Sequence, residues 1–413
     1  MFKNRWWIVF GAIIALICGN GVINVFAAGL FFKPMAAELG FGRGVISTSI
    51  AVTNVMTALT APFLGRLFDK YGVRRVLLLA IVLFAISVAA RAYCTGSVML
   101  LFVIFGIGGI TGTGQSTTGY SKLIAANFEK ERGLALGLTL AGVGLGTAIV
   151  PQYARYLLTH FGWRHAYWGM GVLIMVLAFV PAFIFFPRDT AQGAKQAVAA
   201  RANLAGIDFS EAVRGYRLWA IWLFMFFSTV AINGSLIQIV PMLTDRGIPV
   251  GAATAALSFS GLALIVGRVF SGYLMDKIFA PYIGIFFVVL PIFGLGILGL
   301  GLHGAGPTIG TILLGMGMGA ELDLLGYIIA AYFGNKAFGT LHGFIFMGAL
   351  FANAVGAAML GWIYQFTHSY KLGFIIFEIM LVICVVLLGI LGPYKFPVQR
   401  HKPKPETASA AAR

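Results

Sequence analysis

The sequence predicts an all-α membrane protein of twelve transmembrane helices, arranged as two pseudo-symmetric six-helix halves with both termini in the cytoplasm. Three observations predict this fold. Of the 413 residues, 60% are hydrophobic and only 10% are charged, with a mean hydropathy of +0.93, whereas a soluble domain carries about 25% charged residues. The apolar residues form runs long enough to cross a bilayer, and one short polar motif recurs at matching places in the two halves.

Each predicted span is an apolar run of about 20 residues, which is the length that crosses the hydrocarbon core of a bilayer. The first run follows Lys3 and Arg5 and is too long for the core of a signal peptide, so we expect an uncleaved first helix. The spans are predicted at residues 6–32, 45–66, 76–94, 97–122, 133–158, 166–186, 217–243, 252–274, 281–302, 306–331, 337–364 and 371–393.

Basic residues set the predicted orientation. With the N-terminus in the cytoplasm, 21 of the 29 Lys and Arg residues fall in cytoplasmic segments and 7 fall outside, as the positive-inside rule requires. Residues 187–216 then form a cytoplasmic linker with short interfacial helices between six-helix bundles at residues 1–186 and 217–393. Residues 394–413 are predicted to be a disordered tail. The net charge of +16 suits the anionic cytoplasmic leaflet better than nucleic acid.

The motif G-x-L-x-D-K supports the division into halves. It stands in GRLFDKYGVRR after the second span and in GYLMDK after the eighth, as a parallel duplication of a six-helix unit predicts. With the Asp against a helix N-terminus and the basic residues against headgroups, each loop would act as a two-state latch. The alternative is that these charges only follow the positive-inside rule. The predicted latch residues are Gly65, Asp69, Arg74, Arg75, Gly272, Asp276 and Lys277.

One guanidinium, that of Arg268 in LALIVGRVFSGYLMDK, lies inside the eighth span, about two turns before its polar end. A charge at that depth costs at least ~2.5–3.5 kcal/mol on insertion scales, so such residues usually face a cavity, a counter-charge or a ligand. A guanidinium matches a carboxylate through two parallel hydrogen bonds. We therefore interpret Arg268 as the anion-binding group of a transporter. The alternative is an arginine that reaches the headgroups or pairs structurally with an acid.

Several stretches resemble a known family. The twelve spans and GRLFDKYGVRR resemble the major facilitator superfamily, although Val73 stands where that family usually has a basic residue. The stretches NFEKERGLALGLTLAGVGLG, FGWRHAYWGMG, VGRVFSGYLMDK and GAELDLLGYIIAAYFG are similar to the monocarboxylate transporter and oxalate/formate antiporter branch. The resemblance to this branch implies that the arginine of span eight binds the carboxylate of the substrate.

The chain departs from that branch at two places. Leu264 stands where animal monocarboxylate transporters often have an Asp, one turn before the arginine. Oxalate/formate antiporters place a lysine on the eleventh span, where this chain has Phe344, Ile345 and Phe346. A single intramembrane cation favours a substrate with one carboxylate rather than two.

Two acids in the tenth span, Glu321 and Asp323, are the predicted counter-charge and proton carrier. They lie two residues apart on one helix and cannot face the same point. One would pair with Arg268 and the other would carry the coupling proton, since proton relays commonly use buried acids. The alternative is that they only hold the tenth span to its neighbours. His342 is a further proton-coupling candidate because of its titration range, with a packing role as the alternative.

Polar side chains half-way along the spans complete the predicted substrate site, because transporter sites lie near the midplane between the halves. Asn20 and Asn24 lie one turn apart on the first span and share a face. Any single amide could instead join helices. Besides Arg268, the predicted substrate-binding residues are Asn24, Gln115, Tyr120, Asn233, Gln238 and Tyr327.

We predict a secondary active transporter that moves a small organic monocarboxylate across the cell inner membrane by alternating access with proton symport. The alternatives are an organic-anion exchanger, or drug or metabolite efflux with a purely structural Arg268. No metal-ligand spacing or nucleophile motif indicates an enzyme. We expect no cofactor, H+ as the coupling ion, the organic anion and the lipid bilayer as partners, no nucleic acid, and a functional monomer.

Overall fold

The computed structural model is all-helical over the residues that it describes, which are 5–128, 131–187, 206–275, 277–301, 304–334 and 336–396. In this part of the chain, eleven helical segments are long and apolar enough to cross a membrane. One of them runs over 52 residues, from Leu134 to Phe185. It reverses at Gly162, whose φ is 77°, so the Tyr153 hydroxyl reaches the Gly169 carbonyl oxygen at 3.4 Å. Because the chain reverses inside this segment, it holds two helical arms, which brings the candidate crossings of the described residues to the predicted number of twelve.

The N-terminal half, before residue 188, supplies six of these crossings. The first is α1 (Trp6–Ile17) with the turns η1 (Val22–Phe26) and η2 (Ala28–Phe31), followed by the short helix α2 (Phe32–Leu39). The others are α3 (Arg43–Tyr71), α4 (Val73–Ala90) with η3 (Arg91–Tyr93), α5 (Val98–Gly112) with η4 (Thr113–Gln115) and α6 (Thr117–Asn127), and the two arms of α7 (Arg132–Ile174), which continues into η5 (Met175–Phe179) and α8 (Val180–Phe185).

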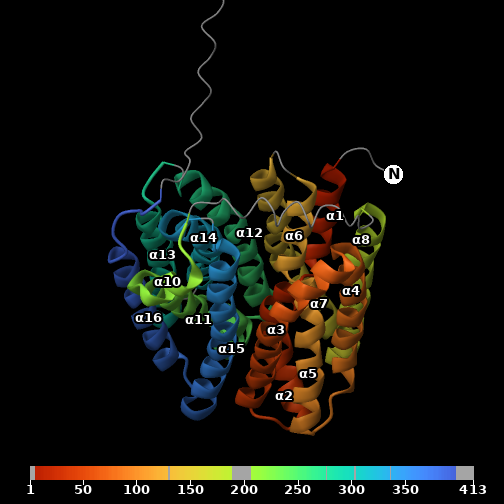
Figure 1. The fold of residues 1–413 in the computed structure, drawn as a ribbon. Helices are drawn as coiled ribbons and strands as arrows, with labels where there is room; N and C mark the ends of the chain where they lie inside the picture. Colours follow the sequence, from red (N-terminus) through yellow and green to blue (C-terminus); the bar gives the residue numbers. More distant parts are fainter. Residues whose placement is uncertain are drawn as a thin grey trace, which may run out of the picture.

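The C-terminal half, from residue 206, begins with the short helix α10 (Phe209–Arg214) and then forms six long helices. These are α11 (Tyr216–Asp245), α12 (Val250–Met275), α13 (Ala280–Leu300), α14 (Gly306–Phe333), α15 (Phe338–Thr367) and α16 (Lys371–Gly389). The two halves stand side by side with their helices roughly parallel to one axis (Figure 1). We call the two ends of the bundle the Trp6 end, where α1 begins, and the Arg43 end, where α3 begins.

The segment predicted to be a linker is described only in part, because residues 188–205 lie outside the described residues, as do residues 397–413 of the predicted tail. Within the described part, α10 forms in the IDFSEAVRG segment. Asp208 precedes α10 without capping it through its side chain. Its carboxylate pairs instead with the Lys336 ammonium at 2.8 Å, which ties the end of the linker to the C-terminal half.

Glycines allow the closest helix contacts, as is usual in membrane bundles, where small residues let backbones approach. A Cβ at Gly315 of α14 would lie 2.2 Å from the Ser260 carbonyl oxygen of α12, and one at Gly319 would lie 2.2 Å from that of Leu264. The halves also meet in this way, since a Cβ at Gly261 of α12 would lie 2.7 Å from the Gly144 carbonyl oxygen of α7. These contacts fix α12, which carries Arg268, against both neighbours.

Replacing Gly315 with Ala should destabilise the protein, because the added methyl would strike backbone that cannot rotate away. We expect a loss of ~1–3 kcal/mol in the free energy of unfolding, the usual cost of overpacking, measured as a lower Tm of the purified protein in detergent. Gly326→Ala is the matched control on the same helix, since no atom lies within 4 Å of its added Cβ. Equal Tm values for the two variants would contradict this packing.

Candidate functional site

A central cavity of about 160 Å³ lies between the two halves. Its wall combines residues of α1, η1, α3, η4 and α6 with residues of α11, α12, α14 and α15. Its two charged lining residues are Arg268 and Glu321. The remaining lining is apolar, hydroxyl or amide, so a guanidinium and a carboxyl dominate the chemistry of an otherwise neutral chamber.

Arg268 is 9% exposed. Its guanidinium lies beside one carboxylate, and some of its N–H groups donate no hydrogen bond among the described residues. Its Nε lies 3.2 Å from Asp323 Oδ2. The two charges are close enough to form an ion pair, but the Nε–H group does not point at the oxygen. Both Nε and Nη1 of Arg268 lack a hydrogen-bond partner among the described residues. Asp323 itself is not part of the cavity wall. The guanidinium is thus counterbalanced from one side and retains donors for a ligand.

Glu321 has no cation beside it among the described residues. It is 6% exposed, lines the cavity, and its Oε1 accepts a hydrogen bond of 2.5 Å from the Thr229 hydroxyl of α11. The two acids of α14 face different surroundings, as their spacing of two residues requires. Asp323 stands beside a guanidinium, whereas Glu321 stands beside a hydroxyl.

The N-terminal half contributes amides that support one another. Gln115 lines the cavity, donates from Nε2 to the Ala15 carbonyl oxygen at 3.0 Å, and accepts from the buried Tyr120 hydroxyl at 2.5 Å. Asn24 does not line the cavity and instead donates from Nδ2 to Asn20 Oδ1 at 2.5 Å. Of this pair, Asn20 lines the cavity. Asn24 lies behind Asn20, and Tyr120 lies behind Gln115, so neither Asn24 nor Tyr120 is part of the cavity wall.

The other predicted site residues of the C-terminal half fall in different places. Asn233 lines the cavity. Gln238 is buried and donates to the Ser47 hydroxyl at 2.9 Å, so it joins the halves. The His342 ring lies between the rings of Phe338 and Phe346, with centroids 5.8 and 6.0 Å away. Tyr327 has its ring 6.3 Å from that of Tyr394. Neither His342 nor Tyr327 is part of the cavity wall.

A family model described as the Major Facilitator Superfamily matches residues 8–341, which is more than half of the chain. The chain belongs to the Major Facilitator Superfamily. It is therefore a multi-pass membrane transporter rather than an enzyme, and the cavity between its halves is the place where transporters built from repeats hold their substrates.

Three curated relatives in the superfamily show low identity over long stretches. An uncharacterized MFS-type transporter, YcxA of Bacillus subtilis (strain 168), is 24% identical over 94% of this chain and 93% of its own length. An oxalate:formate antiporter of Oxalobacter formigenes is 28% identical over 67% of this chain and 65% of its own length. Monocarboxylate transporter 4 of Rattus norvegicus is 23% identical over 93% of this chain and 82% of its own length.

The superfamily motif after the second span is described only in part. The Lys122 ammonium donates to the Gly65 carbonyl oxygen at 3.4 Å, and Arg74 donates to that of Phe183 at 2.7 Å. Arg75 is exposed at the start of α4. These contacts stay within the N-terminal half. The Asp69 side chain lies outside the described residues, so the latch remains a prediction.

The second copy of the motif follows α12. Gly272 has open space around it. The Lys277 ammonium lies 4.0 Å from the centre of the Tyr273 ring and donates to the hydroxyl of that ring. Asp276 lies outside the described residues.

Sequence reasoning missed a second buried guanidinium. Arg91 is 1% exposed, its Nη2 donates to Asn24 Oδ1 at 2.7 Å, and its Cζ lies 4.4 Å from the centre of the Phe105 ring. The positive-inside count places Arg91 among the seven outside charges. The available signal was its position inside the predicted third span, residues 76–94, because a charge within a span is more informative than one in a loop.

A charged cluster joins the halves at the Arg43 end. Asp245, the last residue of α11, pairs with Lys33 Nζ at 2.8 Å and with both terminal nitrogens of Arg43, one of them at 2.7 Å. The Tyr370 hydroxyl donates to the same carboxylate at 3.2 Å. Nearby, the Gly44 N–H donates to Gln365 Oε1 at 2.7 Å. These contacts close the Arg43 end over the central cavity.

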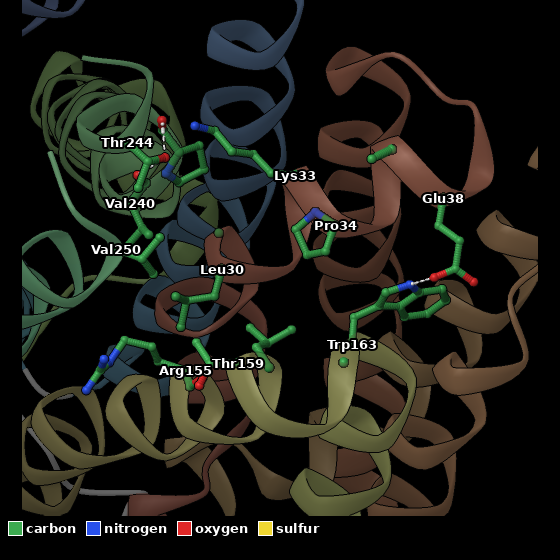
Figure 2. Close-up of a pocket in the computed structure, with 15 residues that line it drawn as sticks. Leu30, Lys33, Pro34, Glu38, Arg155, Thr159, Trp163, Val240, Thr244 and Val250 are labelled. Carbon is green, nitrogen blue, oxygen red and sulfur yellow. Dashed lines mark hydrogen bonds between the residues drawn. The ribbon is translucent and has the colours of Figure 1, made fainter. Parts of the chain in front are cut away.

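A second cavity, of about 530 Å³, opens beside this cluster at the Arg43 end (Figure 2). Leu30, Pro34 and Val250 form part of its apolar wall. On one side of it Trp163 and Arg164 donate hydrogen bonds to Glu38, which lowers the pKa of that carboxyl. The backbones seal its inner side, since a Cβ at Gly29 would lie 2.2 Å from the Ile237 carbonyl oxygen of the other half. This second cavity is a vestibule at the Arg43 end.

Removing the charge of Asp245 should loosen the Arg43 end, because one carboxylate holds two cations of the opposite half. The reporter is a cysteine introduced by Ser47→Cys, at a buried position that contacts Gln238. When Asp245→Asn is added to this variant, the rate of maleimide labelling at position 47 should rise severalfold. The native cysteines are buried and serve as the background. Glu38→Gln is the matched control, since its ion pair with Arg164 stays within one half. Unchanged labelling would show that the cluster does not hold this end closed.

Proposed function

We propose that this protein is a secondary active transporter that carries a small organic monocarboxylate together with a proton across the cell inner membrane. The observation that carries the proposal is Arg268, a nine-tenths buried guanidinium on the cavity wall whose Nε and Nη1 lack hydrogen-bond partners among the described residues. Guanidinium and carboxylate form strong paired hydrogen bonds. The relatives named as an oxalate:formate antiporter and a monocarboxylate transporter support the same class of substrate.

Glu321 suits the proton-carrying role better than Asp323. A buried carboxylate is costly when no cation compensates it. Glu321 is hydrogen-bonded by hydroxyl groups, that of Thr229 among them, whereas Asp323 lies beside the Arg268 guanidinium. With Glu321 ionised and the site empty, these three side chains carry one net negative charge. A bound acid anion adds a second, and a proton on Glu321 removes it again. The loaded site then has the same charge as the empty one, which favours moving acid and proton together.

The positive-inside rule places the Trp6 end in the cytoplasm, since the predicted cytoplasmic segments hold 21 basic residues. The Arg43 end is then the outer face, and the Asp245 cluster is an outer gate in its closed position. An outward-open state requires this gate to part while the halves rock about the central cavity.

An exchanger is the second candidate function, because one relative is named as an antiporter. The same cavity would serve either mode. Uptake that depends on trans-side anion and ignores a proton gradient would favour exchange.

Arg268→Lys should weaken binding of the transported acid by about tenfold or more. Lysine keeps the charge but loses the planar pair of donors, and a hydrogen bond to a charged group contributes ~1.5–3 kcal/mol. The measurement is the concentration dependence of radiolabelled monocarboxylate uptake into proteoliposomes with an inward proton gradient. Arg164→Lys, at an exposed ion pair, should behave as wild type. A wild-type KM in Arg268→Lys would exclude Arg268 as the carboxylate-binding group.

Glu321→Gln should abolish the stimulation of uptake by a proton gradient while preserving acid exchange between the two sides, because glutamine mimics a permanently protonated carboxyl. Asp323→Asn should instead tighten acid binding, because Arg268 loses the carboxylate that competes with the acid for its guanidinium. The two assays are gradient-driven uptake and counterflow in proteoliposomes. The contrary outcome is that Asp323→Asn keeps counterflow but no longer responds to the proton gradient, while Glu321→Gln still responds to it. In that case Asp323 carries the proton.

A further inference from the structure

Three hydrogen-bonded side chains lead from the interior of the N-terminal half to the central cavity. Arg91 Nη2 donates to Asn24 Oδ1 at 2.7 Å, and Asn24 Nδ2 donates to Asn20 Oδ1 at 2.5 Å. Arg91 and Asn24 are each 1% exposed, whereas Asn20 lines the cavity. Asn24 lies in the π-helical turn η1, and such turns are frequent at functional sites. A molecule in the cavity can therefore touch the last member of this series but not the first two.

The guanidinium of Arg91 is held in place although no acid pairs with it in the described part of the chain. Its Cζ lies 4.4 Å from the centre of the Phe105 ring and 5.7 Å from that of Tyr167, and aromatic faces attract a cation. A Cβ at Gly108 would lie 2.8 Å from Nη2, so the group is also confined against α5. A charge buried in this way is costly and usually has a function. Here its hydrogen bond points to Asn24, toward the cavity.

The direction of all three hydrogen bonds follows from the first member. A guanidinium has donors and no acceptor, so the amide oxygen of Asn24 must face Arg91. The Asn24 nitrogen then faces Asn20, which must turn its own oxygen toward that donor. The nitrogen of Asn20 is left for the cavity. Asn20 Nδ2 has no hydrogen-bond partner among the described residues, and unlike Arg91 Nε it is not sealed from the cavity.

We propose that Arg91 is a positioning residue, which acts through Asn24 and fixes Asn20 as a hydrogen-bond donor to the transported acid. This proposal rests on the proposed function and adds a determinant of its specificity. An amide that turned freely would accept from a hydroxyl as readily as it donates to a carbonyl. An amide with a fixed orientation prefers a substrate oxygen that accepts, such as the oxo oxygen of an oxo acid, while the carboxylate binds Arg268.

The orientation of Asn20 can be read from the acids that it favours. An oxo oxygen only accepts a hydrogen bond, a hydroxyl both donates and accepts, and a methylene group does neither. With Asn20 fixed as a donor, oxo acids and hydroxy acids both gain a hydrogen bond over the unsubstituted acid. With Asn20 turned around, only the hydroxy acids keep that gain.

The test compares five acids with four carbons each: butanoate, 2-oxobutanoate, 3-oxobutanoate, 2-hydroxybutanoate and 3-hydroxybutanoate, with both enantiomers of each hydroxy acid. Binding to the purified full-length protein in detergent is measured by calorimetry, and each affinity is divided by that of butanoate. The wild type should bind at least one oxo acid, and a hydroxy acid with its oxygen on the same carbon, about twofold to tenfold more tightly than butanoate. This is the range of one neutral hydrogen bond.

Asn24→Asp should reverse the orientation of Asn20. A carboxylate only accepts, so it accepts from Arg91 on one side and from Asn20 on the other, and Asn20 must turn its oxygen toward the cavity. The new carboxylate also gives Arg91 a counter-charge, so the variant should fold. The oxo acids should lose their advantage over butanoate, whereas the hydroxy acids should keep theirs by donating to Asn20.

Gln152→Glu is the matched control for the added carboxylate. Gln152 accepts from Arg155 Nε at 3.2 Å within the same half, and neither residue is part of the central cavity wall. The Ser258 hydroxyl, which accepts from Gln152 at 3.1 Å, can donate to the new oxygen instead. All affinity ratios should stay as in the wild type.

Two substitutions of Arg91 test the first member of the series independently. Arg91→Lys keeps a side chain that only donates and should retain the advantage of the oxo acids. Arg91→Met has no donor, so the amides can turn, and the oxo-acid advantage should fall at least twofold while the hydroxy-acid advantage stays. A purely structural role of Arg91 would instead change the binding of all five acids by one common factor.

The outcomes separate this proposal from the proposed function. If the wild type binds neither oxo acid more tightly than butanoate, Asn20 does not donate to the acid. If Asn24→Asp keeps the oxo-acid advantage, or loses the hydroxy-acid advantage with it, the series does not orient Asn20. Either result overturns the proposal, while the role of Arg268 stands as long as Arg268→Lys weakens butanoate binding. If Arg268→Lys weakens the binding of no acid, the proposed function itself is overturned.

Discussion

The pairing of a buried guanidinium with a carboxylate in a membrane is the constraint on which the central part of this molecule depends. Arg268 and Asp323 lie 3.2 Å apart on different helices, so α12 and α14 must approach closely. The glycines that face neighbouring backbones on these helices make that approach sterically possible. The incomplete orientation of the pair leaves donors of the guanidinium directed elsewhere. A charge that was fully satisfied by the protein would have nothing left for an anion.

The cavity is chemically asymmetric. Its C-terminal wall carries the charged groups Arg268 and Glu321, whereas its N-terminal wall is lined by neutral apolar, hydroxyl and amide side chains. A charged group and neutral donors serve different purposes, since charge supplies attraction and neutral donors supply discrimination at a smaller desolvation cost. In the proposed cycle, one half would supply most of the attraction for the anion, and the other would test its shape and polarity.

Much of the fold could be predicted from sequence because twenty-residue apolar runs have one physical solution in a bilayer. The twelve predicted spans follow from this, whereas the reversal at Gly162 between the fifth and sixth is a finding of the structure. The site was harder. Arg268 could be found because a charge stands out in an apolar run, and Asn20 and Asn24 could be placed on one face. Which of the two reaches the cavity depends on the π-helical turn η1 and on Arg91 behind it, and no periodicity shows this. The pairing of Gln238 with Ser47 depends on how the two halves meet.

The charged cluster at the Arg43 end has a consequence for the proposed entry of the substrate. Lys33 and Arg43 belong to the N-terminal half and the single Asp245 belongs to the C-terminal half. When the halves separate at that end, two cations on one wall are released from their shared anion. The closed contact keeps one net positive charge, whereas the open mouth would carry two unpaired cations on one wall, and this electropositive rim would concentrate anions from solution. The residues that seal the entrance would, once parted, act as an electrostatic funnel whose strength falls as salt is added.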